Sequence, residues 1–152
     1  MTAPLLQIKG LKLEGRTDEA WQPIIKGIDL NLAKGEVLGL IGESGAGKST
    51  LGLAAMGFCR DGVRVSGGQV VFDEIDLFKA SAAKKRALLG KRIAYVAQSA
   101  AASFNPAHRI IDQHTEAPVQ HGVMSRAESM ADGIALYEKL RLPHPDQIGF
   151  RY

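Results

Sequence analysis

At 152 residues and 45% hydrophobic composition, the chain is long enough to bury a sizeable core. Its 19 Lys and Arg residues against 16 Asp and Glu residues leave a net charge of only +3, without a dense basic stretch, so a nucleic-acid partner is not expected. The single cysteine, Cys59, excludes an internal disulfide and fits a reducing compartment, and we expect it to be at least half-buried.

No apolar stretch approaches the roughly 18 residues of a membrane span, and the first five residues lack the build of a signal peptide. We therefore expect a soluble, cytosolic chain whose association with a membrane depends on a partner.

The first third of the chain predicts strands. Residues 5–13 alternate loosely and indicate an opening strand, 15–23 are polar and predict a loop, and 28–32 alternate with period two. A turn at 34–35 leads into 36–41, a short apolar run of strand length.

That run enters a glycine-rich loop that fits the phosphate-binding pattern G-x-x-x-x-G-K-[ST] without a mismatch: Gly42, Glu43, Ser44, Gly45, Ala46, Gly47, Lys48, Ser49 and Thr50. The three glycines allow successive backbone N–H groups to converge on an anion. Lys48 adds a positive charge that reaches the β- and γ-phosphates, and the Ser49 hydroxyl can ligate Mg²⁺. A helix over 49–56 should follow, so the positive end of its dipole faces the phosphates.

Further elements follow in alternation. Residues 67–72 indicate a strand. Ser81 is expected to be the N-cap of a helix that runs through Leu89 and is terminated by Gly90. Residues 93–97 predict a short apolar strand before Gln98. After a turn at 103–106, helices are expected over 110–117 and 125–141. The second of these should present an apolar face formed by Met130, Ile134, Leu136, Tyr137 and Leu140.

With the loop and Gln98 in view, the chain resembles the ATP-binding subunit of an ABC transporter. In that family a glutamine closes a strand roughly fifty residues after the loop lysine, as Gln98 does here, and it helps to ligate the metal and the attacking water. The resemblance implies an α/β fold, a P-loop NTPase core with a mixed β-sheet over residues 1–98, and the start of a helical subdomain over 99–152.

The stretch after Gln98 narrows the resemblance. A turn at 103–106 that ends in Asn105-Pro106, followed by Gln113 and Glu116 three residues apart, is similar to the dipeptide, oligopeptide and nickel importers of this family. Transported peptides or nickel are therefore the favoured solutes.

Two departures from the family stand out. An aromatic residue usually stacks on the adenine, but Gly15 occupies that place, and Trp21 either substitutes for it or anchors the loop on the sheet. The signature motif, the catalytic glutamate and the switch histidine are absent up to Tyr152, so the chain is expected to be an N-terminal portion that is inactive alone.

Two stretches imitate the absent elements. Residues 66–69 spell the core of the signature but continue into a strand, and 70–74 imitate a strand that ends in a catalytic Asp-Glu pair. We expect both to be structural. The four histidines show no metal-ligand spacing, so surface or packing roles are expected.

The resemblance implies ATP and Mg²⁺ as ligands, with Mg²⁺ bound by Ser49 and Gln98. It also implies permease subunits that bind the region after Gln98, a second ATP-binding subunit, and a location on the cytoplasmic face of the inner membrane. The alternative is a non-catalytic fragment whose loop binds nucleotide or phosphate weakly or not at all.

Overall fold

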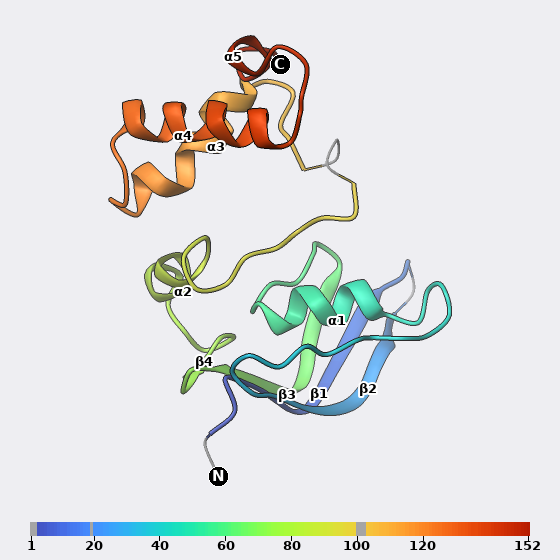
Figure 1. Cartoon of the computed structure of the whole chain (residues 1–152). Helices are drawn as coiled ribbons and strands as arrows, with labels where there is room; N and C mark the ends of the chain where they lie inside the picture. The colour runs from blue at the N-terminus through green and yellow to red at the C-terminus, as the bar shows by residue number, and fades with distance from the viewer. Residues whose placement is uncertain (1–2, 19, 100–102) are drawn as a thin grey trace. The chain divides into compact units, whose positions relative to one another are not determined.

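The computed structural model describes residues 3–18, 20–99 and 103–152. The chain forms two compact units, Met1–Arg86 and Ala87–Tyr152 (Figure 1). The division falls within helix α2 (Ala82–Leu88), earlier than the boundary after Gln98 expected from the sequence. No helix in the described ranges is both long enough and apolar enough to cross a membrane.

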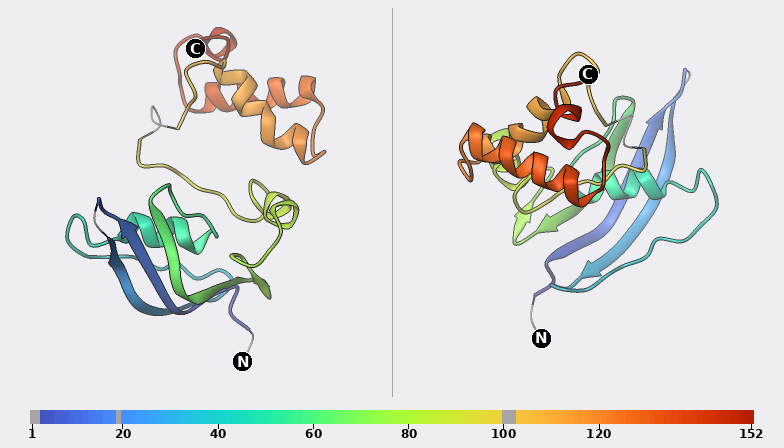
Figure 2. Two further views of the ribbon diagram at one scale, coloured as in Figure 1. Left: turned by 180° about the vertical axis from the view of Figure 1, so that it is seen from behind. Right: turned by 45° about the horizontal axis from the view of Figure 1, so that its top comes forward.

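The first unit contains an antiparallel sheet with the strand order β2-β1-β3-β4. Its strands are β1 (Leu6–Arg16), β2 (Trp21–Leu32), β3 (Val63–Phe72) and β4 (Ile75–Asp76). Helix α1 (Lys48–Ala55) lies over one face of this sheet (Figures 1 and 2). The buried apolar side chains of the unit come from the strands, from α1 and from the turn after β4: Ile8, Leu11, Leu13, Ile25, Leu51, Leu53, Ala54, Val70, Phe72 and Leu77.

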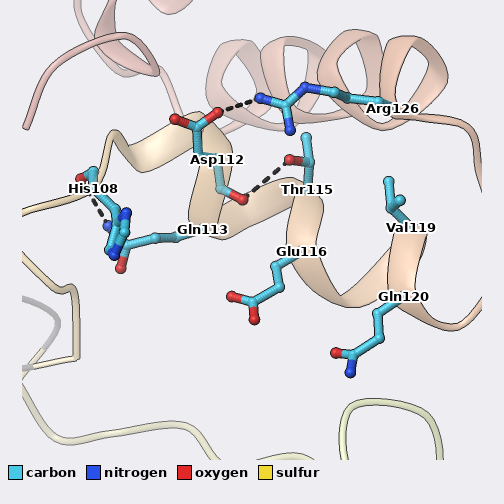
Figure 3. Close-up of a pocket in the computed structure, with 8 residues that line it drawn as sticks. All are labelled: His108, Asp112, Gln113, Thr115, Glu116, Val119, Gln120 and Arg126. Carbon is cyan, nitrogen blue, oxygen red and sulfur yellow. Dashed lines mark hydrogen bonds and ion pairs between the residues drawn. The ribbon is translucent and has the colours of Figure 1, made fainter.

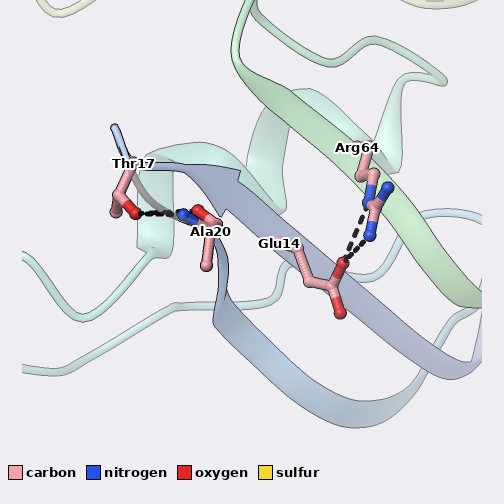
Figure 4. Close-up of polar contacts among 4 residues, drawn as sticks. All are labelled: Glu14, Thr17, Ala20 and Arg64. Atoms are coloured by element: carbon pink, nitrogen blue, oxygen red, sulfur yellow. Dashed lines mark hydrogen bonds and ion pairs between the residues drawn. The ribbon is translucent and has the colours of Figure 1, made fainter.

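The prediction of a loop over 15–23 is wrong for most of that range. Strand β1 continues to Arg16 and β2 begins at Trp21, because Gly15 pairs with Gln22 on one side and with Val63 on the other. A short turn joins the strands. Thr17 Oγ1 donates to the carbonyl oxygen of Ala20 over 2.7 Å, and the Ala20 N–H donates back to Thr17 Oγ1 over 3.1 Å (Figure 4).

The strands predicted over 36–41 and 93–97 are not formed. The described residues provide a single parallel bridge, between Leu89 and Ile93, and no strand beside 36–41. A strand exists only where a neighbour satisfies its backbone N–H and C=O groups. The parallel part of the expected mixed sheet is therefore not formed within the described residues.

The second unit is helical, as the sequence predicts. It contains α3 (Ile110–Gln120), α4 (Arg126–Lys139) and α5 (Pro145–Ile148), together with the end of α2. Ser125 caps α4 through a complete capping box with Glu128. The tail closes against α3, since the Ile111 N–H donates to the carbonyl oxygen of Gly149 over 2.7 Å.

The buried face of α4 differs from the expected one. Ser129, Gly133 and Tyr137 are its buried residues, whereas Leu136 and Leu140 are exposed. Glycine favours this close approach, because a Cβ atom at position 133 would lie 3.0 Å from the His114 ring, which is tighter than an ordinary contact. Helices α3 and α4 thus approach closely over small side chains, and hydropathy alone does not reveal this.

Candidate nucleotide-binding site

The glycine-rich loop leads directly into α1. Gly45 and Gly47 adopt left-handed conformations, with φ values of 85° and 84°, while Gly42 does not. Gly47 is also the N-cap of α1, and a Cβ atom there would lie 3.0 Å from Ile25 Cδ1 and 3.2 Å from Ile24 Cγ2. At this position both the backbone conformation and the close approach of β2 demand glycine.

Lys48 reaches back across the loop. Its ammonium group donates to the carbonyl oxygens of Gly42, over 2.7 Å, and Glu43, over 2.6 Å. The Ala46 N–H also donates to the Glu43 carbonyl oxygen over 3.2 Å, so the loop closes into a compact ring around the lysine side chain. The ammonium charge is therefore held at the loop that the sequence assigns to phosphate.

The N-terminus of α1 presents free donors. Its N-cap has no side-chain hydrogen bond, and its first turn contains no acidic residue. Among the described residues, no acceptor contacts the backbone N–H groups of Lys48, Ser49 and Thr50 or the Ser49 hydroxyl. Such unsatisfied donors at the positive end of a helix bind anions. An exposed serine hydroxyl at this point also fits a ligand of Mg²⁺.

Trp21 carries a contact that the sequence did not reveal. The Arg64 guanidinium lies 4.2 Å from the centre of a Trp21 ring. Glu14 holds this guanidinium, since its Oε2 accepts from Arg64 Nε over 2.9 Å and from Nη2 over 2.8 Å (Figure 4). One face of the tryptophan is therefore already covered by a side chain of the same sheet.

The register places Trp21 and the loop on opposite faces of the sheet. A Cβ atom on Gly15 would lie 2.9 Å from Ile24 Cδ1, and the same Ile24 side chain packs beside Gly47. Trp21 pairs with Arg16, the neighbour of Gly15, so its side chain projects from the other face. This geometry favours the alternative in which Trp21 anchors the hairpin over the one in which it stacks on adenine.

Gln98 lies in the second unit and is exposed. The Asn105-Pro106 turn that follows is held by Gln113 of α3. The Gln113 side chain accepts from the Asn105 N–H over 2.8 Å and donates to the carbonyl oxygens of Asn105 and His108, both over 3.0 Å. In the sequence, Asn105 and Gln113 were only two positions of the pattern shared with the importers. The structure shows that they are joined by hydrogen bonds.

Beside this turn, α3 borders a surface pocket of about 440 Å³ (Figure 3). At its rim Asp112 forms an ion pair with Arg126 at the start of α4, and the Thr115 hydroxyl donates to the Asp112 carbonyl oxygen over 3.1 Å. The pocket is lined by His108, Asp112, Gln113, Thr115, Glu116, Val119, Gln120 and Arg126. Most of the side chains that line this pocket are charged or amide groups, whereas enclosed ligand sites are lined mainly by apolar and aromatic side chains.

The two stretches that resemble the signature motif and the catalytic Asp-Glu pair, 66–69 and 70–74, are structural. Residues 66–69 lie inside β3, which pairs with β1, and do not begin a helix. Asp73 and Glu74 have φ values of 47° and 66° and form the turn between β3 and β4. They serve as hairpin residues there.

Among the described residues, no group of three or more His, Cys, Asp or Glu side chains could hold a metal ion. His121 Nε2 contacts the carbonyl oxygen of Leu89 at 2.8 Å, and His114 packs edge-on against Tyr137. These two histidines therefore have packing roles. Cys59 is half-buried as expected, and burial raises the pKa of its thiol.

Residues 25–148 match the model of the family described as "ABC transporter". The chain belongs to the ABC transporter family. The match contains both the glycine-rich loop and Gln98, so the ABC resemblance seen in the sequence is confirmed.

Several relatives of this ABC chain are named for peptide transport. The peptide transport system ATP-binding protein SapD of Salmonella typhimurium is 36% identical over 107 residues, which are 70% of this chain and 32% of SapD. The probable peptide ABC transporter ATP-binding protein y4tR of Sinorhizobium fredii is 30% identical over 94% of this chain and 43% of the relative. A putative peptide import ATP-binding protein of Brucella abortus is 34% identical, with 93% and 43% covered. The chain thus spans less than half the length of these relatives.

Solved structures confirm the fold. The bacterial ABC transporter cassette MJ0796, in a dimeric structure, matches with a TM-score of 0.76 at 18% identity, over 96% of this chain and 60% of that one. A post-hydrolysis dimer of the same cassette, bound to ADP and Pi, matches with a TM-score of 0.73 over the same shares. The α/β cassette fold expected from the sequence is therefore present.

Proposed function

We propose that this chain is the nucleotide-binding portion of an ABC importer and that it binds ATP with Mg²⁺ at residues 42–50. The main support for this proposal is the position of the Lys48 ammonium group. Its ammonium group is held inside a loop whose following N–H groups have no acceptor among the described residues, so positive charge and free donors converge where phosphates would bind.

Each residue of the loop has a role in this proposal. The backbone from Glu43 to Gly47 surrounds the β-phosphate, and Lys48 exchanges its carbonyl acceptors for β- and γ-phosphate oxygens. The Thr50 hydroxyl and N–H donate near the α-phosphate. The Ser49 hydroxyl would hold Mg²⁺, which when bound neutralises charge on the β- and γ-phosphates. The titles of the MJ0796 structures, one of them bound to ADP and Pi, support nucleotide as the ligand class.

The transported solute is proposed to be a peptide, in line with the names of the relatives from Salmonella, Sinorhizobium and Brucella. We place the permease contact after Gln98, in 99–152, where the Asn105 turn and the pocket on α3 present amide and charged groups. Residues 1–98 then act as the nucleotide core, on the cytoplasmic face of the inner membrane. A second ATP-binding subunit completes the functional dimer.

Hydrolysis by these 152 residues alone is expected to be negligible. Phosphoryl transfer requires positioning, charge stabilisation and an oriented water. In this proposal Lys48 and Gln98 contribute to positioning and to charge stabilisation. The Asp73-Glu74 pair forms the turn between β3 and β4, so we assign it no role in orienting this water.

Thermal denaturation with and without MgATP tests the proposal. A ligand at 100 times its dissociation constant stabilises the protein by about 2.7 kcal/mol, so millimolar MgATP should raise the melting temperature measurably. Lys48→Ala should abolish the shift, and Lys79→Ala, which removes an exposed lysine paired with Asp76, should leave it unchanged.

If MgATP does not stabilise the chain, the ATP-binding proposal is wrong and the non-catalytic fragment is the better interpretation. One observation favours that second candidate: residues 36–41, which enter the loop, are not part of a sheet. Sustained turnover by the purified chain that is lost in Lys48→Ala would contradict the predicted lack of hydrolysis instead.

A further inference from the structure

The face of the sheet that α1 does not cover is rich in positive charge. Successive side chains of a strand point to opposite faces, so the neighbours of the buried Ile8 and Leu13 of β1 lie on this outer face. Residues that are paired across strands share a face, which adds their partners on β2 and β3. The exposed cations placed in this way form what we call the basic face: Lys9, Lys12 and Arg16 on β1, Lys26 on β2 and Arg64 on β3.

The basic face is assembled by the sheet and is not visible as a run in the sequence. Its members come from positions 9, 12, 16, 26 and 64, and only the pairing of β2 and β3 with β1 brings them together. The described residues of these three strands place two carboxylates on the same face, Glu14 and Asp29. The whole chain has a net charge of +3, so its excess of cations is concentrated here.

Both carboxylates of this face already have partners. Glu14 binds the Arg64 guanidinium (Figure 4), and Asp29 Oδ1 accepts from the Gly10 N–H over 2.8 Å. Among the described residues, no carboxylate or other acceptor contacts the ammonium groups of the three lysines in the basic face. An anion from outside the chain therefore meets unpaired ammonium groups on this surface.

Lys12 and Lys26 are directly opposite each other on β1 and β2. Like charges in this position destabilise a sheet. The surface around Lys12 is open, because Gly27 and Gly67 lie beside it without side chains: Cβ atoms built there would lie 3.8 Å from Lys12 Cε and 3.4 Å from Lys12 Cδ. An arrangement that is unfavourable for the fold, without a compensating contact inside it, indicates a functional surface.

We propose that the basic face binds the anionic headgroup surface of a membrane. All exposed large apolar side chains among the described residues lie outside β1–β4, so this face lacks the apolar and aromatic core of a specific protein interface. Binding to an anionic lipid surface requires only clustered Lys and Arg side chains close to it. The charge of the basic face is therefore sufficient for a membrane contact.

Single-stranded nucleic acid fits the basic face less well. Such ligands stack their bases on exposed aromatic side chains. Trp21, which lies on this face, is half-buried and has the Arg64 guanidinium 4.2 Å from its ring centre. The membrane contact goes beyond the proposed function, since it involves neither ATP nor the permease. The sequence predicts that membrane association depends on a partner, and the basic face adds a contact that the chain makes itself.

The test is sedimentation of the full chain with vesicles of phosphatidylcholine and phosphatidylglycerol in equal amounts. At about 0.1 M salt, where the Debye length is about 10 Å, we expect the chain to bind these vesicles, and about 1 M salt should release it. Vesicles of phosphatidylcholine alone, which are neutral, should not bind the chain.

Matched double substitutions locate the contact. Lys12→Gln with Lys26→Gln should weaken vesicle binding about thirtyfold, since each cation near an anionic surface contributes about fivefold. Lys12→Arg with Lys26→Arg keeps the charge and should bind like the wild type. Lys84→Gln with Arg86→Gln removes the same charge from exposed positions of α2 and should leave binding nearly unchanged. The melting temperature verifies the fold, and the Lys12→Gln, Lys26→Gln variant should melt no lower than the wild type because a like-charge pair is removed.

Four results would overturn the proposal. These are the absence of binding to the anionic vesicles, equal binding to the neutral vesicles, an equal loss of binding in the α2 variant, and a preference for another polyanion. The last is measured with octaglutamate and with single-stranded DNA as competitors: displacement of the chain from vesicles at low concentrations of either would identify an acidic polypeptide or a nucleic acid as the ligand. None of these readouts involves ATP, so failure of the membrane proposal and failure of the proposed ATP binding can be told apart.

Discussion

The Arg64 guanidinium covers one face of Trp21, with its central carbon 4.2 Å from the ring centroid, and Glu14 holds it there by two hydrogen bonds. This cluster lies on the face of the sheet opposite to Gly47, because Gly47 and Gly15 share the Ile24 side chain. The contact links three strand residues that are up to fifty positions apart in the sequence. It explains why a tryptophan is tolerated, half-buried, near the end of the hairpin.

The first prediction concerns Trp21 as an optical reporter. It is the only tryptophan in the chain, so its fluorescence reports this cluster alone. Saturating MgATP should leave the emission unchanged, because the indole lies on the opposite face from the loop. Quenching by MgATP, without quenching by inorganic triphosphate, would show that the base stacks on Trp21 and would reverse our interpretation.

The same cluster should contribute modestly to stability. Arg64→Ala removes a cation–π contact and a partly exposed ion pair, so a loss of about 1 kcal/mol in the free energy of unfolding and a red shift of the emission are expected. Arg60→Ala, at an exposed arginine close in sequence, is the control and should change stability by less than about 0.5 kcal/mol.

The second prediction compares two glycines on either side of Lys48. Gly47→Ala places a Cβ atom at φ 84° and within 3.0 Å of Ile25 Cδ1, so it should cost at least about 1–2 kcal/mol in the free energy of unfolding. Gly52→Ala lies inside α1 with open space around it and should stabilise the chain by up to about 1 kcal/mol. Urea denaturation measures both. Equal effects would contradict the observed backbone of the loop.

The third prediction concerns the Asn105 turn. Gln113→Ala removes three hydrogen bonds to this turn and should cost about 1 kcal/mol, whereas Gln120→Ala, on the same helix without such contacts, should be nearly neutral. Gln113→Glu should be worse than Gln113→Ala, because its carboxylate would face the carbonyl oxygens of Asn105 and His108. If Gln113→Glu is tolerated, the amide is not held in this orientation.

The fourth prediction is the pH dependence of the α4 cap. Hydrogen bonds from the Ser125 side chain, and then from its backbone N–H, hold the pKa of Glu128 below its ordinary value. A depressed pKa in the folded state stabilises above the unfolded pKa of about 4.3, and this contribution is lost as the pH falls through the folded pKa.

Unfolding titrations of the wild type and Ser125→Ala test this dependence. Ser125→Ala should cost about 1 kcal/mol at pH 7, and the difference from the wild type should narrow in acid. Glu128→Gln, which keeps the capping geometry but does not titrate, should remove that pH dependence. A difference between wild type and Ser125→Ala that stays constant from pH 7 to pH 3 would show that the cap does not depend on the charge of Glu128.

Several elements could be predicted from local patterns. The loop at 42–50, the N-cap at Ser81, and the helices α3 and α4 follow from residue types at short, fixed spacings. The failures share one cause. Residues 36–41 and 93–97 have the composition of strands, but a strand depends on a neighbour that is distant in the sequence, and the described residues do not supply one.

By itself, the amino-acid sequence determined the chemical identity of the phosphate loop, because its function requires particular residues at fixed positions and little else. Only the tertiary structure decided which face of the sheet Trp21 occupies, how Gln113 holds the Asn105 turn, and that Val37 and Ile41 remain uncovered. These facts depend on strand register and on packing between distant residues. A pattern read along one chain does not contain them, since pairing partners and cover come from elsewhere in the fold.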